Sequence, residues 1–428
     1  MSDRPSFGRV EKLLGEMVAA GIVSSAAGLV GTDAEILWEG AIGEANPATR
    51  FDYASLTKPF VATLALTLDA GGVLPLATRI GDLWPQAHRK LARRPLSDLL
   101  RHRSGLAAWT PLYYLCDGCR SVDEAVELIL AGGKEGELLG ARAGTYSDLG
   151  YILWGRAAEL ATGTPLAAML QARVLAPLGL VSVEPTPGDR PDIARSYMGT
   201  GQEVKLAATQ GFAVPDLGPP PVGTPQDGNG RFLVGLPLPR PSSPRPSSPA
   251  PSHPPHREKR EKSKTAPTGS PSPGEGGWAG AGEGTGVRVF GRGRFEAWSA
   301  PLGLCGHAGL FGDARDLWRL GLEWLAPGRL LKPEEVAAAL AGSGPFALGW
   351  WRRTLRGSAG PALPSTAFGH TGFAGNCFWI DPEGRRIFVM LASRCDPAAD
   401  MNHWRRRFNS AAARSILDLG RVLTDGAS

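Results

Sequence analysis

The sequence has little of several features that would assign it directly to a class of protein. No uncharged apolar run reaches about eighteen residues, which excludes a membrane-spanning helix of ordinary length. Five cysteines are too few, and odd in number, for a disulfide scaffold. Cys116 and Cys119 form a CxxC without a second half-site or a strand-CxxC-helix context, so we expect them in a surface loop. The N-terminal stretch has scattered charges and no apolar core, so no secretory signal is expected and a cytoplasmic location is favoured.

Charge gives no support for a nucleic-acid partner. The net charge is +5, but the segment from Pro237 to Glu275 carries seven Lys or Arg and three Glu, which amounts to +4. The remainder of the chain therefore carries a net charge of only +1. Nucleic-acid binding requires a basic surface, and this net charge does not predict one. Lysine is scarce, with nine in the whole chain, so a lysine in a defined motif is informative.

The two ends of the chain have matching patterns of apolar residues. Helical spacing, strand-like runs and turn residues predict a helix over Val10–Val18, strands over Ala26–Val30, Ile36–Ile42, Asn376–Ile380 and Arg386–Ser393, and a helix over Phe408–Leu423. Between them the pattern is mostly helical, over Pro59–Ala70, Leu96–Arg101, Val122–Ala131, Leu149–Ala161 and Pro165–Leu175. We expect an α/β (α+β) fold: an antiparallel sheet domain from residues 1–50 and 300–428, flanked by terminal helices, with a mainly helical domain inserted at 51–213.

Residues 214–299 differ in composition from the rest. Seventeen of the 37 prolines lie between Pro215 and Pro273, in a Pro/Gly/Ser-rich, basic segment. Such a composition buries too little apolar surface to offset its ordering entropy, which predicts a mostly disordered, partly polyproline-II insert. A docking segment for a reader of PxxP motifs or for an acidic partner, and a translated non-coding stretch, are the alternative interpretations.

Ser55-Leu56-Thr57-Lys58 is the only SxxK in the chain, and it stands at the start of the helical run Pro59–Ala70. Residues three apart at a helix start lie on one face, so the Lys58 ammonium could reach the Ser55 hydroxyl. Taken alone, the motif also fits an N-cap serine followed by a solvated lysine.

Two further motifs follow in order: Tyr146-Ser147-Asp148 before a predicted helix, and His370-Thr371-Gly372 before a predicted strand. With the flanking segments FDYASLTKPFVAT, LLRHRSGL and GHAGLFGDARDL, the chain resembles the serine β-lactamase-related family. That family includes class C β-lactamases, D-Ala-D-Ala carboxypeptidases, penicillin-binding proteins and family VIII carboxylesterases. The resemblance covers residues 7 to about 235 and about 300 to 420, and implies a β-lactamase/transpeptidase-like fold.

The resemblance also implies roles for these residues. Ser55 would be the acylated nucleophile, Lys58 would take or relay its proton, and Tyr146 would be the second acid/base. The backbone N–H groups of Ser55 and Phe373 would form the oxyanion hole. The substrate-binding residues would be Asp148, His370, Thr371 and Gly372.

The implied activity is that of a serine hydrolase acting through an acyl-enzyme on an ester or amide: a β-lactam, a D-Ala-D-Ala-type peptide or a small carboxylic ester. No metal, organic cofactor, nucleic acid or membrane span is expected, and the sequence leaves the oligomeric state open. The alternative is a non-catalytic penicillin-binding or adaptor protein of the same fold that uses the Pro-rich insert for docking.

Two residues depart from the class C pattern, and two histidines are expected to be structural. Asp148 replaces Asn, and an anion there cannot donate to a substrate amide and would repel a substrate carboxylate. His370 replaces Lys, which removes a fixed positive charge. We expect His102 and His307 to be hydrogen-bonding structural residues, because no other metal-ligating side chain stands at ligand spacing.

Overall fold

The computed structural model describes residues 7–108, 122–133, 136–142, 144–185, 196–199, 287–290, 304–396 and 399–425. The chain divides into two units, one made of Met1–Asp216 and Arg288–Ser428 and the other of Leu217–Val287. The predicted insert at 214–299 and the Cys116–Cys119 pair lie outside the described residues, apart from the short strand β6 (Val287–Phe290). The architecture below is that of the first unit.

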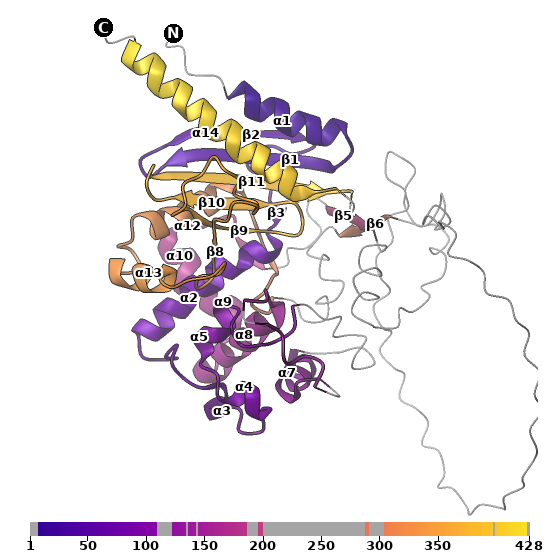
Figure 1. Ribbon diagram of the computed structural model, residues 1–428, viewed down its shortest axis with the longest axis vertical. Coiled ribbons are helices and arrows are strands. Elements are labelled where there is room, and N and C mark those ends of the chain that lie inside the picture. The colour runs from indigo at the N-terminus through magenta and orange to yellow at the C-terminus, as the bar shows by residue number, and fades with distance from the viewer. Residues whose placement is uncertain are drawn as a thin grey trace, which may run out of the picture. The chain divides into compact units, whose positions relative to one another are not determined.

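A six-stranded antiparallel sheet has the strand order β2-β1-β11-β10-β9-β8. Its strands are β1 (Val23–Thr32), β2 (Ile36–Gly43), β8 (Trp351–Arg352), β9 (Phe368–Thr371), β10 (Cys377–Asp381) and β11 (Arg386–Arg394). The N-terminal and C-terminal hairpins lie side by side because β1 pairs with β11 (Figure 1). The predicted antiparallel sheet built from both ends of the chain is confirmed.

Side chains of β11 alternate between two hydrophobic cores. Phe388 and Met390 pack with α1 (Gly8–Ala19) and α14 (Met401–Asp425), which cover the same face of the sheet (Figure 1). Ile387, Val389 and Leu391 point to the opposite face and join the core of the helical part. Burial of a side chain of this size stabilises the fold by about 1.5–3 kcal/mol, so the period-two pattern fixes which face each residue occupies.

The helix α14 begins seven residues earlier than the sequence pattern predicts, at Met401. The segment before Phe408 is polar and rich in arginine, so its apolar spacing is weak. The Asp400 carboxylate accepts the backbone N–H of Asn402 at 2.9 Å, which satisfies one of the free donors at the helix start.

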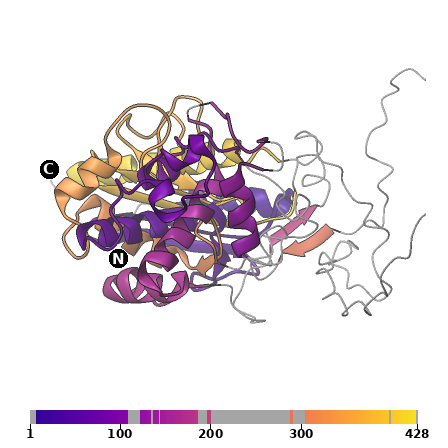
Figure 2. The same ribbon diagram turned by 90° about the horizontal axis from the view of Figure 1, so that it is seen from below.

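The helical part lies on the other side of the sheet, and Figure 2 views it from the end where α3 and α4 are found. Its helices are α2 (Thr57–Ala70), α3 (Ile80–Leu83), α4 (Arg89–Ala92), α5 (Leu96–Leu100), α7 (Val122–Ala131), α8 (Asp148–Thr162), α9 (Leu166–Leu170) and α10 (Ala176–Leu178). The helix predicted over Pro165–Leu175 is α9 followed by a π-helical turn, η2 (Gln171–Leu175). α12 (Ala314–Leu325) and α13 (Pro333–Leu340) complete the set. One core cluster includes α2, α8, α12 and the sheet, so the helical part shares its core with the sheet.

Short strands join the two parts of the fold. β3 (Phe51–Asp52), β7 (Leu310–Gly312) and β4 (Glu184–Pro185) form a three-stranded sheet in the order β3-β7-β4. β5 (Ser196–Gly199) pairs with β6 in a separate two-stranded sheet. β3 leads directly into the segment that carries Ser55, so this small sheet positions the start of α2.

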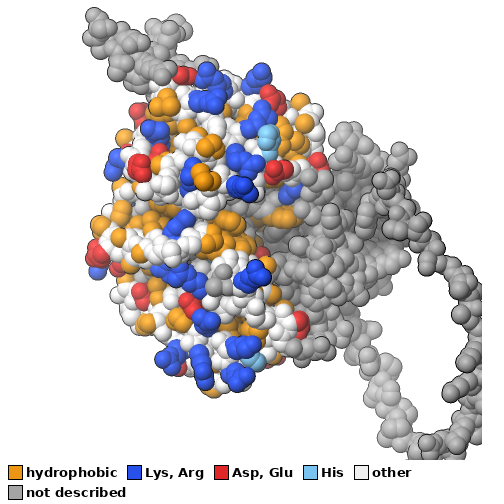
Figure 3. Space-filling view, in the orientation of Figure 1, with side chains coloured by type: hydrophobic (Ala, Val, Ile, Leu, Met, Phe, Trp, Pro, Cys, Tyr) orange, Lys and Arg blue, Asp and Glu red, His pale blue; other side chains and the backbone are white. Residues whose placement is uncertain are grey.

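Surface charge gathers at one end of the helical part. Figure 3 shows Lys and Arg side chains over the end of the molecule where α3, α4 and α5 lie. Arg89, Lys90, Arg93 and Arg94 from this region are exposed. Within the part of the chain that the structure describes, no helix combines the length and apolarity needed to cross a membrane.

Candidate active site

The turn before α2, which carries Ser55, contains a residue in an uncommon backbone conformation. Ser55 lies in a 3₁₀ turn, η1 (Ala54–Leu56), directly between β3 and α2. Ala54 has a φ of +48°, a left-handed conformation that costs a residue with a Cβ roughly 1–2 kcal/mol. The Asp52 carboxylate accepts the Ala54 N–H at 2.7 Å and so stabilises this turn.

Lys58 is fully buried, and its ammonium has two hydrogen-bond acceptors and one carboxylate at ion-pair distance. Its Nζ lies 2.9 Å from Ser55 Oγ, 2.9 Å from the backbone oxygen of His307 and 2.7 Å from Asp148 Oδ1. The spacing of Ser55 and Lys58 in the sequence predicts their contact correctly. The other two partners come from distant parts of the chain, and the sequence pattern alone did not predict them.

Gly306 allows the His307 carbonyl to reach Lys58. Its φ is +96°, and a Cβ at this position would lie 2.3 Å from the backbone oxygen of Tyr151. Only glycine fits such a close approach of two backbones. Its presence in the segment GHAGLFGDARDL was the one sequence signal that could have marked this loop as part of the site.

Tyr146 and Asp148 reach the site from the start of α8. Asp148 is the first residue of that helix, where a carboxylate interacts favourably with the helix dipole. The Tyr146 ring lies 5.0 Å from Lys58 Nζ and 4.5 Å from the ring of His102. The structure therefore brings Ser55, Lys58, Tyr146 and Asp148 together, as the order of the motifs predicts.

Asp148 forms an ion pair with Lys58, so its charge is compensated within the site. The sequence analysis treats Asp148 as an anion facing the substrate, and the structure adds a partner that this interpretation lacked. Unlike an asparagine, an aspartate supplies both an acceptor and a counter-charge to a buried ammonium.

Burial and neighbouring charges shift the ionisation of these groups. Burial lowers the pKa of the Lys58 ammonium, and the charge of Asp148 opposes this effect without cancelling it. Burial acts to raise the pKa of Asp148, but its interactions with Lys58, His307 and His102 together outweigh burial and leave the pKa below its usual value. For Tyr146, burial raises the pKa well above 10, Asp148 raises it further, and a hydrogen bond with Ser55 partly offsets both. The tyrosine hydroxyl is therefore protonated at neutral pH.

Three histidines near the cluster are held neutral. Burial lowers the pKa of His102 to about 3, that of His307 to about 4, and that of His370 well below its usual value. His102 Nδ1 accepts the backbone N–H of Ser147 at 2.9 Å, which orders the loop that carries Tyr146. A hydrogen-bonding structural role for His102, as predicted, agrees with this contact.

His370 and Thr371 end strand β9, next to the site. The His370 and Tyr146 rings are 5.9 Å apart, and His370 Nδ1 lies 2.9 Å from the backbone oxygen of Thr371. Because a carbonyl oxygen only accepts, Nδ1 carries the proton and Nε2 is an acceptor. Gly372 follows β9, and a Cβ there would lie 2.7 Å from the backbone oxygen of Tyr53. Glycine at this position therefore lets the end of β9 approach the turn that carries Ser55.

Two further aromatic side chains pack beside the ring of Tyr146. Its ring centroid is 5.4 Å from that of Trp351 and 5.9 Å from that of Phe346, and these two rings contact each other edge to face. The residues around the cluster are thus mostly aromatic and uncharged, apart from the Lys58–Asp148 pair. The sequence analysis did not predict Trp351 or Phe346, because neither belongs to a motif.

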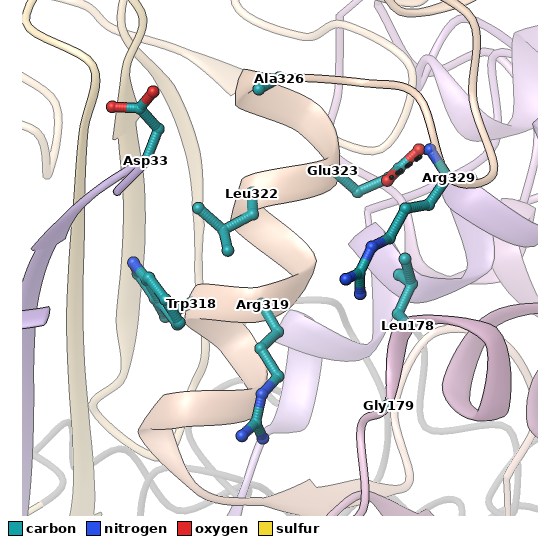
Figure 4. A pocket seen from close by; sticks show the side chains of 9 residues that line it. All are labelled: Asp33, Leu178, Gly179, Trp318, Arg319, Leu322, Glu323, Ala326 and Arg329. Carbon is teal, nitrogen blue, oxygen red and sulfur yellow. Dashed lines mark hydrogen bonds between the residues drawn. The ribbon is translucent and has the colours of Figure 1, made fainter. Parts of the chain in front are cut away.

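A separate groove of about 490 Å³ runs along α12 (Figure 4) and includes none of the predicted site residues. Trp318, Arg319 and Glu323 line it. Both Glu323 carboxylate oxygens accept backbone N–H groups of the loop at residues 328–331. Glu323 thus orders this loop, and its acceptors are occupied by backbone rather than directed into the groove.

Comparison with known proteins identifies the family. The model of the beta-lactamase family matches residues 10–413. The chain belongs to the beta-lactamase family. The family resemblance predicted from the three motifs is confirmed, and so is the β-lactamase/transpeptidase-like fold.

This beta-lactamase-family chain is similar in sequence to an esterase and in fold to a hydrolase and an amidase. Esterase EstB of Burkholderia gladioli is 31% identical over 195 residues, covering 37% of this chain and 48% of that protein. The chain thus matches about half the length of this curated relative. Two solved structures share the fold at low identity. EstCE1, a hydrolase with promiscuous acyltransferase activity, has 17% identity and a TM-score of 0.60, with 94% and 98% of the two chains covered. The D-amino acid amidase of Ochrobactrum anthropi SV3 has 18% identity and a TM-score of 0.61, with both chains fully covered at 100%.

Proposed function

We propose that this protein is a serine hydrolase that forms an acyl-enzyme on Ser55. The observation that carries the proposal is the position of Lys58 Nζ, 2.9 Å from Ser55 Oγ in a fully buried setting. A buried lysine with a lowered pKa is a suitable base for a serine hydroxyl, because its neutral form is populated nearer to neutral pH. The family membership and the esterase relative support the same reaction class.

In this mechanism Ser55 Oγ attacks the substrate carbonyl carbon, and its proton passes to neutral Lys58 Nζ. The carbonyl oxygen becomes an oxyanion that accepts hydrogen bonds from the backbone N–H groups of Ser55 and Phe373. The tetrahedral intermediate collapses, the bond to the leaving group breaks, and Tyr146 donates its hydroxyl proton to that group. The Lys58 ammonium returns a proton to Tyr146, and water then hydrolyses the ester in the same sequence of steps. The raised pKa of Tyr146 supports its role as a proton donor and relay rather than a standing base.

Neutral esters and small amides with an apolar acyl group are the substrates that this site favours. Lys58 and Asp148 compensate each other, and the buried imidazole of His370 is uncharged where class C enzymes carry a lysine. A substrate carboxylate therefore gains little attraction from these groups. Trp351 and Phe346 beside Tyr146 offer an apolar surface to an acyl chain.

Covalent labelling and ester hydrolysis test the proposal. The wild-type protein, incubated with a fluorophosphonate, should gain the mass of one phosphonyl group on Ser55 by intact-mass and peptide spectrometry. Ser55→Ala should lose this label and the hydrolysis of p-nitrophenyl butyrate, whereas Ser182→Ala, which alters a buried serine bonded to the N–H of Asp313, should keep both.

Two results would contradict the proposal in different ways. Ester hydrolysis at the wild-type rate by Ser55→Ala would exclude Ser55 as the nucleophile. A kcat/KM for nitrocefin above that for p-nitrophenyl butyrate would leave the serine mechanism intact but exclude the preference for neutral esters.

A further inference from the structure

A buried arginine from the C-terminal helix holds the turn that follows β9. Arg405 is 7% exposed. Its Nη2 donates to the backbone oxygen of Gly372 at 2.6 Å, and its Nε donates to that of Asn376 at 3.0 Å. Its Nη1 donates to Asn402 Oδ1 at 2.8 Å. Burial lowers the pKa of Arg405 to about 10, so the guanidinium remains charged at neutral pH.

This arrangement is costly, which argues for a specific role. A buried guanidinium loses its hydration, and among the described residues no carboxylate lies within ion-pair distance of Arg405. Carbonyl oxygens of one turn supply its main acceptors instead. An apolar side chain would fill the same space between α14 and the sheet without that desolvation cost.

Asn376 connects the same turn to the nucleophile. Its Nδ2 donates to the backbone oxygen of Asp52 at 2.7 Å, within the strand that leads to Ser55. Its Oδ1 accepts the Ala392 N–H at 2.9 Å, and its backbone oxygen accepts the Gly372 N–H at 3.1 Å. The turn from Gly372 to Asn376 is thus fixed to β11, to α14 and to the segment before Ser55.

The contact between Arg405 and Gly372 acts on one particular peptide group. The carbonyl of Gly372 and the N–H of Phe373 belong to the same amide. A charged donor on an amide oxygen draws electron density from its nitrogen, which makes the N–H a stronger donor. We propose that Arg405 is a positioning residue for the oxyanion hole: it fixes and polarises the Gly372–Phe373 peptide, so that the Phe373 N–H stabilises the oxyanion more strongly. The inference rests on the proposed acyl-enzyme mechanism.

Two substitutions at Arg405 separate its effects, and one elsewhere on α14 is the control. Arg405→Met removes the charge and all donors, and Arg405→Lys keeps the charge but cannot bridge the carbonyls of the turn. Asn409→Leu is the matched control, because Asn409 is fully buried on the same helix and donates to Ser358 and Ala359 carbonyls instead. Each variant is first compared with wild type in thermal stability.

Three measurements then follow: kcat and KM for p-nitrophenyl butyrate, the rate of labelling by a fluorophosphonate, and the inhibition constant of an alkyl trifluoromethyl ketone. Ser55 Oγ adds to the carbonyl carbon of the ketone, and the resulting hemiketal places an anionic oxygen where the oxyanion forms. Because loss of a whole oxyanion donor costs about 10²–10³-fold in kcat, weakening one should cost roughly ten- to a hundred-fold. We expect Arg405→Met to lower kcat and to raise the inhibition constant of the ketone by a similar factor, with KM nearly unchanged. The values for Arg405→Lys should lie between those of wild type and Arg405→Met.

The outcomes distinguish this inference from the proposed function. If wild type is labelled and Arg405→Met keeps the wild-type kcat and ketone affinity, or loses no more than Asn409→Leu, the inference is overturned. If Arg405→Met does not fold, Arg405→Lys decides: wild-type values overturn the inference, and a several-fold loss in kcat and ketone affinity supports it. If wild type itself neither hydrolyses the ester nor reacts with the fluorophosphonate, the proposed function fails, and the inference with it.

Discussion

Replacing Asp148 by Asn tests whether Lys58 is the base that deprotonates Ser55. The variant keeps an acceptor for Lys58 Nζ but removes the counter-charge 2.7 Å away. At an effective dielectric constant of about 20, two unit charges at that distance attract by roughly 6 kcal/mol, and desolvation offsets part of this. Opposite charges this close commonly change a pKa by about one to three pH units.

The direction of the effect follows from the role of the neutral amine. Asp148 favours the charged form of Lys58, so its removal lowers the pKa of Lys58 further. Because only neutral Lys58 can accept the serine proton, kcat/KM rises with pH through this pKa. We therefore expect the acid limb of the kcat/KM profile to move to lower pH by about one to three units in Asp148→Asn. The plateau should fall, because a weaker base takes the proton less readily.

The assay is kcat/KM for p-nitrophenyl butyrate in buffers from about pH 5 to 10 at constant ionic strength, with the free enzyme's ionisation read from the acid limb. Asp98→Asn is the control, since it removes a carboxylate that pairs with Arg94 at the surface. An acid limb that stays in place, or moves to higher pH, would refute Lys58 as the base.

Four further substitutions have expected outcomes. Burial raises the pKa of Asp52 to about 7, so the folded protein retains a proton that the unfolded chain releases, and the free energy of unfolding should fall as pH rises from about 4 to 7. Asp52→Asn should remove this fall. The idea is wrong if urea titrations at about pH 5 and 8 show the same change in the free energy of unfolding for Asp52→Asn as for wild type. Lys58→Ala and Tyr146→Phe should each lower kcat by about 10²–10⁴-fold with intact folding by circular dichroism, and near wild-type turnover in either would exclude that residue from proton transfer. Phe408→Ala should lower the free energy of unfolding by about 3–5 kcal/mol, because the side chain is fully buried between α14 and the sheet; a loss under about 1 kcal/mol would mean that α14 contributes little to this core.

The regular elements at both ends of the chain could be predicted because their periodicity reflects burial directly. Ile387, Val389 and Leu391 alternate with Phe388 and Met390, and each set packs against a different helical layer. The strand could be predicted from this pattern without knowing which elements pack on it, because apolar residues occupy both of its faces. The predicted strand at Arg386–Ser393 therefore matches β11 to within one residue.

The short strands that position Ser55 could not be predicted in the same way. β3 has two residues and β7 has three, too few for a period to be visible. Their pairing depends on segments far apart in the sequence, with Asp52 opposite Phe311. What holds the nucleophile turn in place is therefore tertiary structure, although the SxxK spacing itself is local.

The same distinction separates the predicted from the unpredicted parts of the site. Ser55 and Lys58 meet because they stand three residues apart at a helix start, and this spacing is visible in the sequence. Arg405 contacts Gly372, which is 33 residues away in the sequence. Its own segment is rich in arginine, and such a composition predicts an exposed face of a helix. Only its burial and its carbonyl acceptors distinguish it from Arg406 and Arg407, whose partners are at the surface. An arginine whose charge is directed at a backbone turn leaves no motif, because its acceptors are carbonyl groups that every residue carries.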